Sequence, residues 1–197
     1  MGSIVTMVLA SQPGEGFATA RWLARVGQTT LLDHVLAQAR RWPSEPSLVV
    51  LGSDAEEVLD RIDFTGFAVL IDPEWQEGEA ASLRAGLDFL GREPDGDAVL
   101  LASGEMPILP PGAVEEIVGA HQSAGTPATV PKYRYARGRP MVLGRELWPR
   151  LLGIEVGTTL EGVLATHAKW VTEVWIDHLP PPKITTPEDL RLLAHPH

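Results

Sequence analysis

Apolar residues occur along this chain in short continuous runs, and the first run is the clearest. Residues 4–10 carry no charged side chain and are followed by a Ser-Gln-Pro-Gly loop. A run of this length that ends in turn residues is typical of a parallel strand buried on both faces. Similar runs predict short strands at 47–51, 68–71, 98–101, 128–131, 141–143 and 171–176.

Between these runs, apolar residues recur at helical spacing. In 31–41 they fall at Leu31, Leu32, Val35 and Leu36, ahead of a basic end, which predicts an amphipathic helix. The other predicted helices are 55–61, 82–90, 112–124 and 159–167, together with a last helix that opens at Pro187. Strands that alternate with helices across short connections predict a three-layer α/β fold with a mostly parallel twisted sheet.

The composition is that of a water-soluble globular protein. The chain has 197 residues, of which 44% are hydrophobic, and a mean hydropathy of +0.01. This length suits one core, and we expect a single domain over residues 1–197. The sequence has no apolar run near the roughly 18–20 residues of a membrane span, no basic export signal and no cysteine. These features predict a cytoplasmic protein without a membrane partner or disulfides.

Charge is distributed unevenly along the chain. The net charge of −10 argues against a nucleic-acid binder. Residues 51–105 hold 14 acids against three arginines, whereas residues 132–150 hold six bases against Glu146 alone. The basic segment is either a solvated surface or a rim that attracts a phosphorylated small molecule by its local field.

Ligands of such sheets bind at the carboxyl ends of the strands, close to a switch in strand order. The predicted strands place four loops there, at 10–30, 72–82, 103–109 and 131–140. Binding and catalytic side chains are therefore expected in these four loops.

Two of the loops carry extended sequence patterns. Residues 72–87 read Asp-Pro-Glu-Trp-Gln-Glu-Gly-Glu-Ala-Ala-Ser-Leu-Arg-Ala-Gly-Leu, and residues 104–107 read Gly-Glu-Met-Pro. Both resemble MobA-like nucleotidyltransferases, most closely the branch that cytidylylates molybdopterin, and the resemblance covers about residues 4–194. It implies the Rossmann-like nucleotidyltransferase fold, which is GT-A-like.

In the 72–87 pattern, Gly78 to Ala81 let a helix N-terminus approach a ligand with little side-chain bulk, and Ser82 offers a hydroxyl. The resemblance implies that Gly78 and Ser82 bind the nucleotide. The alternative is an ordinary first turn of a helix, with Trp75 in the core.

The loop at 10–30 is similar to the family's triphosphate loop but departs from it at several positions. Ser11 and Gln12 replace an Ala-Gly pair, Gly16 stands at the family's arginine and Arg21 at its lysine. A phosphate loop needs close backbone approach and a cation, and Gly14, Gly16 and Arg21 still supply these. The resemblance thus implies nucleotide binding by Ala10, Ser11, Gly14, Gly16 and Arg21. A dinucleotide motif formed by Gly14 and Gly16 is a weak alternative, because the third glycine is missing.

The remaining candidates are charged side chains. Glu105 stands where the family has an aspartate that holds Mg²⁺, so the resemblance implies that Glu105 is the metal ligand. Lys183 resembles a phosphate-binding lysine of the cytidylyltransferases of isoprenoid synthesis. Residues 137–140 resemble the family's Gly-His-Pro motif, with Arg139 in place of the histidine and Arg137 just before the motif, and both arginines are assigned to the acceptor side. The alternatives are a solvated turn acid at Glu105 and an exposed lysine in a helix-capping segment at Lys183.

The resemblance implies an Mg²⁺-dependent enzyme that transfers a nucleoside monophosphate, most simply CMP from CTP, to a phosphorylated acceptor of molybdopterin type and releases pyrophosphate. Arg21, Glu105 and Lys183 would act in catalysis, and a molybdoenzyme or its chaperone would be the protein partner. The rival hypothesis is a catalytically lapsed protein of the same fold that binds or regulates, since Gln12, Gly16, Arg21 and Glu105 all depart from the family pattern.

Overall fold

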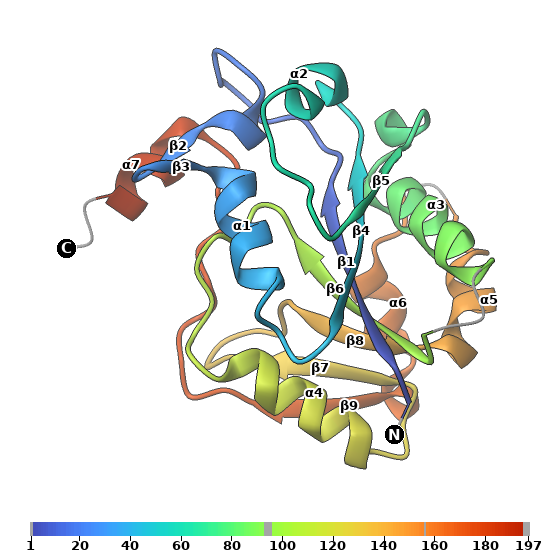
Figure 1. The fold of residues 1–197 in the computed structure, drawn as a ribbon. Helices are drawn as coiled ribbons and strands as arrows, with labels where there is room; N and C mark the ends of the chain where they lie inside the picture. The colour runs from blue at the N-terminus through green and yellow to red at the C-terminus, as the bar shows by residue number, and fades with distance from the viewer. Residues whose placement is uncertain (1, 93–95, 156, 195–197) are drawn as a thin grey trace.

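The computed structural model describes residues 2–92, 96–155 and 157–194, and its centre is a seven-stranded sheet (Figure 1). The strands lie in the spatial order β5-β4-β1-β6-β8-β7-β9. β8 is antiparallel to both of its neighbours, and the other strand pairs are parallel. The strand bounds are Ile4–Ala10 (β1), Glu45–Leu51 (β4), Ala68–Ile71 (β5), Ala98–Ser103 (β6), Ala128–Lys132 (β7), Met141–Gly144 (β8) and Val171–Trp175 (β9).

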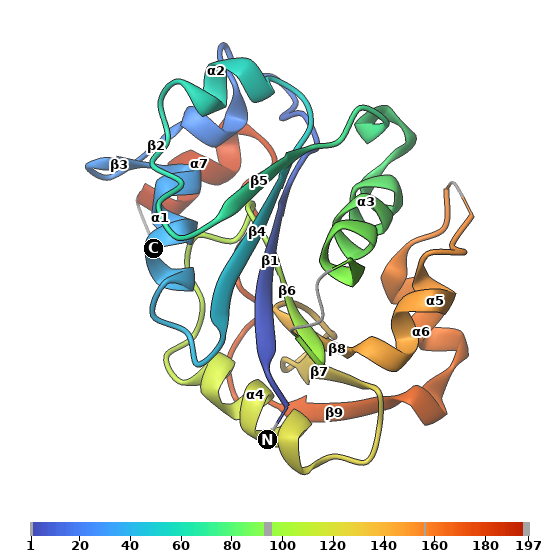
Figure 2. The same ribbon diagram turned by 45° about the vertical axis from the view of Figure 1, so that its right-hand side comes forward.

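Helices cover both faces of this sheet (Figures 1 and 2). One face carries α1 (Leu31–Ala39), α2 (Ala55–Leu59), α4 (Ala113–Ser123) and α7 (Pro187–Ala194). The other face carries α3 (Glu79–Gly91), α5 (Trp148–Leu151) and α6 (Leu160–Thr166). A small hairpin of β2 (Arg25–Val26) and β3 (Thr29–Thr30) precedes α1.

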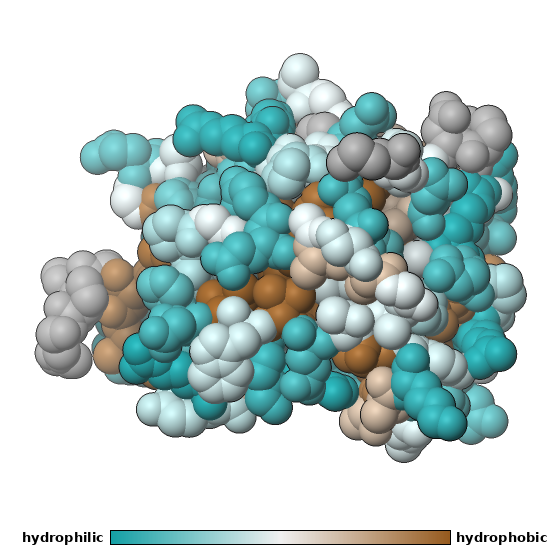
Figure 3. All heavy atoms as spheres, turned by 90° about the horizontal axis from the view of Figure 1, so that it is seen from below, coloured by the Kyte–Doolittle hydropathy of each residue, from teal (hydrophilic) through white to brown (hydrophobic). Residues whose placement is uncertain are grey.

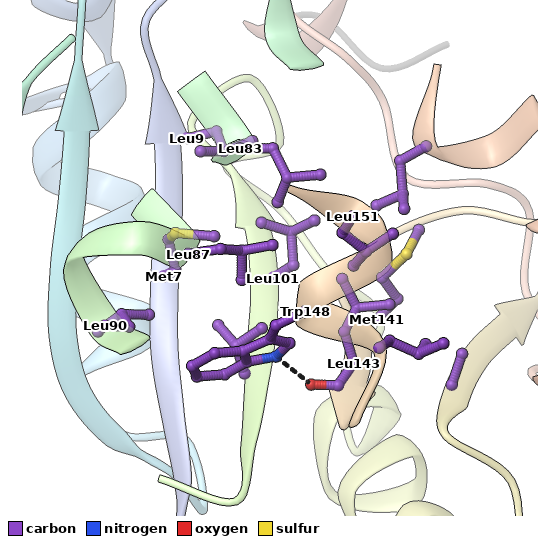
Figure 4. Close-up of a cluster of buried hydrophobic side chains, with 14 of the residues drawn as sticks. Met7, Leu9, Leu83, Leu87, Leu90, Leu101, Met141, Leu143, Trp148 and Leu151 are labelled. Carbon is purple, nitrogen blue, oxygen red and sulfur yellow. Dashed lines mark hydrogen bonds between the residues drawn. The ribbon is translucent and has the colours of Figure 1, made fainter. Parts of the chain in front are cut away.

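The continuous apolar run of β1 follows from this burial on two sides. Val5, Met7 and Leu9 pack into the core beneath α3, whereas Val8 and Ala10 pack into the core beneath α1. Successive side chains of a strand point to opposite faces, so a strand covered on both sides needs apolar residues throughout. Figure 4 shows the first of these cores, where the Trp148 indole N–H donates to the Leu143 carbonyl at 3.2 Å.

The predicted fold class is confirmed by the observed layers and strand order. The local differences have clear causes. Helix α3 begins at Glu79 and not at 82, because Gly78 has a φ of +104° and sets the turn just before it. Helix α5 was not predicted, since its four residues are too few to show helical periodicity.

The surface is mixed in polarity. Seen from below, the molecule is mostly hydrophilic, with hydrophobic residues exposed in small patches between polar side chains (Figure 3). In the ranges that the structure describes, every helix is too short or too polar to cross a membrane.

Candidate functional site

The candidate site lies at the carboxyl ends of β1, β4, β5 and β6. The chain passes from β1 outward through β4 to β5 and then returns to β6 on the other side of β1. Such a reversal opens a crevice outside the strand ends. The predicted loops at 10–30, 72–82 and 103–109 follow these strands, and the loop at 131–140 joins β7 to β8.

Backbone contacts tie the loop after β1 to its neighbours. The Ser11 carbonyl accepts a hydrogen bond from the Ser53 N–H at 2.9 Å. The Gln12 side chain donates to the Trp75 carbonyl at 2.8 Å. A Cβ at Gly52 would lie 2.5 Å from the Ser11 carbonyl oxygen, so only glycine permits this approach. The residues at 11–12, 52–53 and 75 therefore form one connected rim.

Arg21 is held beside this rim by several contacts. It opens a short 3₁₀ turn, is buried, and lies over the Trp22 ring at 4.3 Å from the ring centroid. One terminal nitrogen donates to the Gln12 carbonyl at 2.7 Å, and the other lies 3.0 Å from a Glu105 carboxylate oxygen. Burial lowers the pKa of Arg21, and the Glu105 carboxylate opposes that shift. A Cβ at Gly14 would lie 2.6 Å from the Arg21 Cβ, so Gly14 makes room for this arginine.

Glu105 therefore contacts Arg21, the cationic side chain predicted to bind phosphate. Its backbone is fixed, because its N–H donates to the Ser103 hydroxyl at 3.2 Å and its carbonyl accepts from the Ile184 N–H at 2.8 Å. Over the described ranges, no group of three His, Asp or Glu side chains is placed to hold a metal ion. With Arg21 beside its carboxylate, Glu105 as arranged does not fit a divalent cation, although it has the oxygen donors that such an ion prefers.

The helix start after β5 is built around Asp72. This buried carboxylate accepts hydrogen bonds from the Glu74 N–H at 2.9 Å and from the Ser82 hydroxyl at 2.6 Å. Ser82 is fully buried, so its hydroxyl serves Asp72 in this structure. Gly78 keeps open space around its Cα and lines a small pocket of about 140 Å³ with Glu79 and residues 157–159.

The two acceptor-side arginines are both paired with acids. Arg139 is buried and is held by Glu79, with one contact at 3.0 Å, and by Glu161 at 2.9 Å. Arg137 donates to Glu173 at 2.6 Å on the edge strand β9. Burial favours the neutral form of Glu161, yet Arg139 holds its pKa below the usual value. Arg139 thus joins the N-terminal turns of α3 and α6.

Lys183 differs from these arginines because, among the described residues, no salt bridge holds it, although its charge helps to lower the pKa of Glu161. It lies in the segment before α7 and lines an open pocket of about 430 Å³ with Asp189. Gly16 adopts a φ of +75°, and a Cβ there would lie 3.7 Å from Pro187 at the start of α7. The segment of Lys183 is thus packed close to the loop after β1.

The structure brings Ala10, Ser11, Gly14, Arg21 and Glu105 together at the ends of β1 and β6. Gly78 and Ser82 stand on the neighbouring α3 start, and Arg137 and Arg139 lie farther along the sheet, beyond β6. The roles of Asp72, Glu79 and Glu161 are not evident from the sequence. The only available signal was the acid in the first turn of α3 and of α6, which does not reveal a shared arginine.

The mostly parallel seven-stranded sheet with helices on both faces defines an α/β protein with the Rossmann-like fold of nucleotidyltransferases. Residues 6–170 match the family of MobA-like NTP transferase domains, and the chain belongs to this family. The resemblance seen in the motifs is therefore confirmed.

Curated relatives are distant enzymes. The chain is 26% identical over 131 residues to the bifunctional protein GlmU of Leifsonia xyli, which covers 65% of this chain and 27% of GlmU. It is 28% identical over 131 residues to the 2-C-methyl-D-erythritol 4-phosphate cytidylyltransferase of Syntrophotalea carbinolica, which covers 62% of this chain and 55% of that enzyme. The matched part thus spans about a quarter to a half of these relatives.

Solved structures match almost the whole chain. A homologue of Mycobacterium tuberculosis Rv0371c from Mycobacterium sp. strain JC1 has a TM-score of 0.83 at 26% identity, covering 97% of this chain and 95% of the other. Rv0371c in complex with manganese has a TM-score of 0.83 at 22% identity, covering 99% and 100%. The molybdopterin-guanine dinucleotide biosynthesis protein A of Archaeoglobus fulgidus has a TM-score of 0.70 at 16% identity, covering 96% of each chain. The last two show the fold alone.

Proposed function

We propose that this protein transfers a nucleoside monophosphate from a nucleoside triphosphate, with CTP favoured, to a phosphorylated acceptor of molybdopterin type in the cytoplasm. The observation that carries the proposal is the match of residues 6–170 to MobA-like NTP transferase domains. The gathering of the loops after β1 and β6 at one edge of the sheet supports it. A molybdoenzyme or its chaperone would then receive the product.

The reaction needs charge neutralisation and alignment more than a strong base. A phosphate oxygen of the acceptor attacks the α-phosphorus of the nucleotide. The bond from the α-phosphorus to the bridging oxygen breaks, and pyrophosphate leaves with the bonding electrons. The backbone of residues 10–16 would cradle the phosphates, and Arg21 and Lys183 would offset their charge.

The second half of the site would position the two substrates. Gly78 would let the α3 N-terminus approach the nucleotide. We propose that Ser82 keeps this helix start in place through its hydrogen bond to the Asp72 carboxylate at 2.6 Å. Arg137 and Arg139 stay proposals for the acceptor side. Because Arg139 is already paired with two glutamates, its part would be to hold the pocket wall in place.

Mg²⁺ is the proposed cofactor, with Glu105 as its ligand. When bound, such an ion neutralises charge on a triphosphate. The Arg21 contact at Glu105 prevents this role in the arrangement seen here, so we assign no reaction step to the ion.

The test is pyrophosphate release from CTP, GTP and ATP, each with and without Mg²⁺, in the presence of molybdopterin. Arg21→Ala and Glu105→Ala should each lower the rate by about 10²–10³. Arg61→Ala is a matched control, because it removes an exposed arginine of a surface ion pair. Unchanged release in both site variants would refute these roles.

A second candidate is a lapsed enzyme that binds or regulates without turnover. The specific observation in its favour is that Arg21 and Glu105, both departures from the family pattern, neutralise each other. Restoring Gln12→Gly, Gly16→Arg, Arg21→Lys and Glu105→Asp together should create pyrophosphate release in a silent protein if this candidate is right. Robust turnover by the wild type would reject it.

A further inference from the structure

A small pocket of about 140 Å³ lies between the start of α3 and the segment that leads into α6. Residues 77–80 form one wall of this pocket and residues 157–159 form the other. We propose that Arg139 and Arg84 are positioning residues for the acceptor, because they hold the two walls at a fixed distance and so shape the pocket that receives it. The inference rests on the proposed function and adds which residues decide the affinity for the acceptor.

The two arginines join the walls at different points. Arg139, buried in the loop between β7 and β8, bonds to Glu79 at the start of α3 and to Glu161 in the first turn of α6. Arg84, in the second turn of α3, donates to the Ile154 carbonyl at 2.8 Å. The wall that precedes α6 is therefore fastened to α3 on both of its sides. Both helices cover the same face of the sheet (Figure 2).

The backbone that carries Arg139 is itself fixed. The Tyr133 hydroxyl donates to the Arg139 carbonyl at 3.0 Å, and the Tyr133 side chain is buried. A Cβ at Gly138 would lie 2.8 Å from the Tyr133 ring, so the residue before Arg139 has to be small. The guanidinium is thus presented from a packed base, which a side chain that sets a distance requires.

The two walls differ in how they are anchored. The α3 start has an anchor of its own, because the Ser82 hydroxyl bonds to the Asp72 carboxylate. The α6 start is capped by Thr159, whose hydroxyl accepts from the Gly162 N–H at 3.1 Å. This cap stabilises the turn but does not attach it to α3. Removal of Arg139 should therefore release the wall at α6 and leave the α3 start, with the proposed nucleotide contact at Gly78, in place.

The arginines also balance the charge of the pocket. Two of its lining residues are acids, and each is paired, Glu77 with Arg84 at 3.3 Å and Glu79 with Arg139 at 2.5 Å. Without the arginines, these carboxylates would repel a phosphorylated acceptor. Loss of either arginine should therefore weaken acceptor binding both by loosening a wall and by adding unbalanced negative charge.

An electrostatic link connects this cluster to the lysine predicted to bind phosphate. Burial raises the pKa of Glu161, but the charge of Arg139 and, to a lesser extent, that of Lys183 hold this pKa below its usual value. Glu161 thus lies within electrostatic range of Lys183. An acceptor held beside this cluster would have its phosphate in the field of that lysine.

The first experiment measures KM for CTP and KM for molybdopterin in pyrophosphate release. Arg139→Gln should raise KM for molybdopterin about tenfold, because one wall is released and Glu79 loses its counterion. Arg84→Gln should raise it about threefold, because the contacts of Arg139 remain. KM for CTP, and kcat at saturating molybdopterin, should stay within about twofold of the wild type. An equal rise of both KM values, or a fall of kcat alone, would overturn the proposal.

Arg139→Lys keeps the proposal testable if Arg139→Gln does not fold. Lysine retains the charge but cannot hold two carboxylates in a fixed geometry, so KM for molybdopterin should rise by an intermediate factor of about three. Arg61→Gln, in an exposed pair with Glu57, is the control and should behave as the wild type. A wild-type KM for molybdopterin in both Arg139→Lys and Arg84→Gln contradicts the proposal.

The second experiment does not depend on turnover. Molybdopterin binding, followed by quenching of tryptophan fluorescence, should weaken about tenfold in Arg139→Gln. Hydrogen exchange of the backbone amides should become faster at residues 158–164 and stay unchanged at residues 79–84. Absence of molybdopterin binding by the wild type would overturn the assignment of the pocket to the acceptor.

Failure of the proposed function would look different. In that case no nucleoside triphosphate supports pyrophosphate release, while molybdopterin binding and hydrogen exchange still respond to Arg139→Gln as stated. Normal turnover with binding and exchange unchanged in Arg139→Gln would instead reject the positioning role and leave the proposed function standing.

Discussion

Ser82→Ala separates a structural role of this serine from a role as a nucleotide ligand. Its hydroxyl donates to Asp72 at 2.6 Å, and both side chains are buried. The remaining partner that the structure gives this carboxylate is the Glu74 N–H at 2.9 Å. Removal of the hydroxyl leaves one oxygen of a buried carboxylate unsatisfied.

A hydrogen bond to a charged group contributes about 1.5–3 kcal/mol. We therefore expect Ser82→Ala to lower the free energy of unfolding by about 2 kcal/mol. At about 2–4 °C per kcal/mol for a chain of this size, the melting temperature should fall by roughly 4–8 °C.

Urea denaturation followed by tryptophan fluorescence measures the change, with calorimetry for the melting temperature. Ser123→Ala is the matched control, because the Ser123 hydroxyl is exposed and bonds within α4. It should change stability by less than about 0.5 kcal/mol. A Ser82→Ala protein of wild-type stability with reduced CTP affinity would refute the structural reading and favour direct contact with the nucleotide.

Three further predictions follow from other parts of the structure. Arg139→Ala should lower the free energy of unfolding, measured by urea denaturation, by about 2 kcal/mol. This is less than the roughly 3–5 kcal/mol typical of a fully buried ion pair, because the side chains of its two glutamate partners are 41% and 45% exposed. An unchanged denaturation midpoint would contradict this prediction. Gly86→Ala should destabilise the protein by about 1–3 kcal/mol, because the new Cβ would lie 2.3 Å from the buried Met7 sulfur. Gly119→Ala should instead stabilise the protein by about 0.5–1 kcal/mol, because a Cβ at this position in α4 meets open space. Hydrogen bonds from Thr185 and Thr186 lower the pKa of Asp189 to about 2, below its value in the unfolded chain. The carboxylate therefore stabilises α7 above about pH 4, and this stabilisation is lost as the pH falls towards 2. Hydrogen exchange of the α7 amides measures the loss, and Asp189→Asn should abolish its pH dependence.

The fold could be predicted because the signals that define it are local. The apolar run at 4–10 and the helical spacing at 31–36 each reflect burial that any stable arrangement of these segments requires. The β2–β3 hairpin was not predicted because its strands have two residues each, and α5 was not predicted because its four residues make barely one helical turn.

The candidate site could be predicted only as positions along the chain. The sequence showed that Arg21 and Glu105 depart from the family pattern but not that they contact each other. They lie in the segments after β1 and β6, two strands that are neighbours in space but far apart along the chain. The same holds for Arg139 and its glutamates, which lie 60 and 22 residues away along the chain. Pairing of charges is a property of the tertiary structure, and it decides which cations remain available to a phosphate.

The most direct test of the central claim is ³¹P nuclear magnetic resonance of the wild-type protein with CTP, Mg²⁺ and molybdopterin. We predict that CTP is consumed while pyrophosphate and a new diphosphate linkage between CMP and the acceptor phosphate appear together in equal amounts. No consumption of CTP, or release of CMP and pyrophosphate without the new linkage, would contradict the claim that this protein transfers CMP to an acceptor of molybdopterin type.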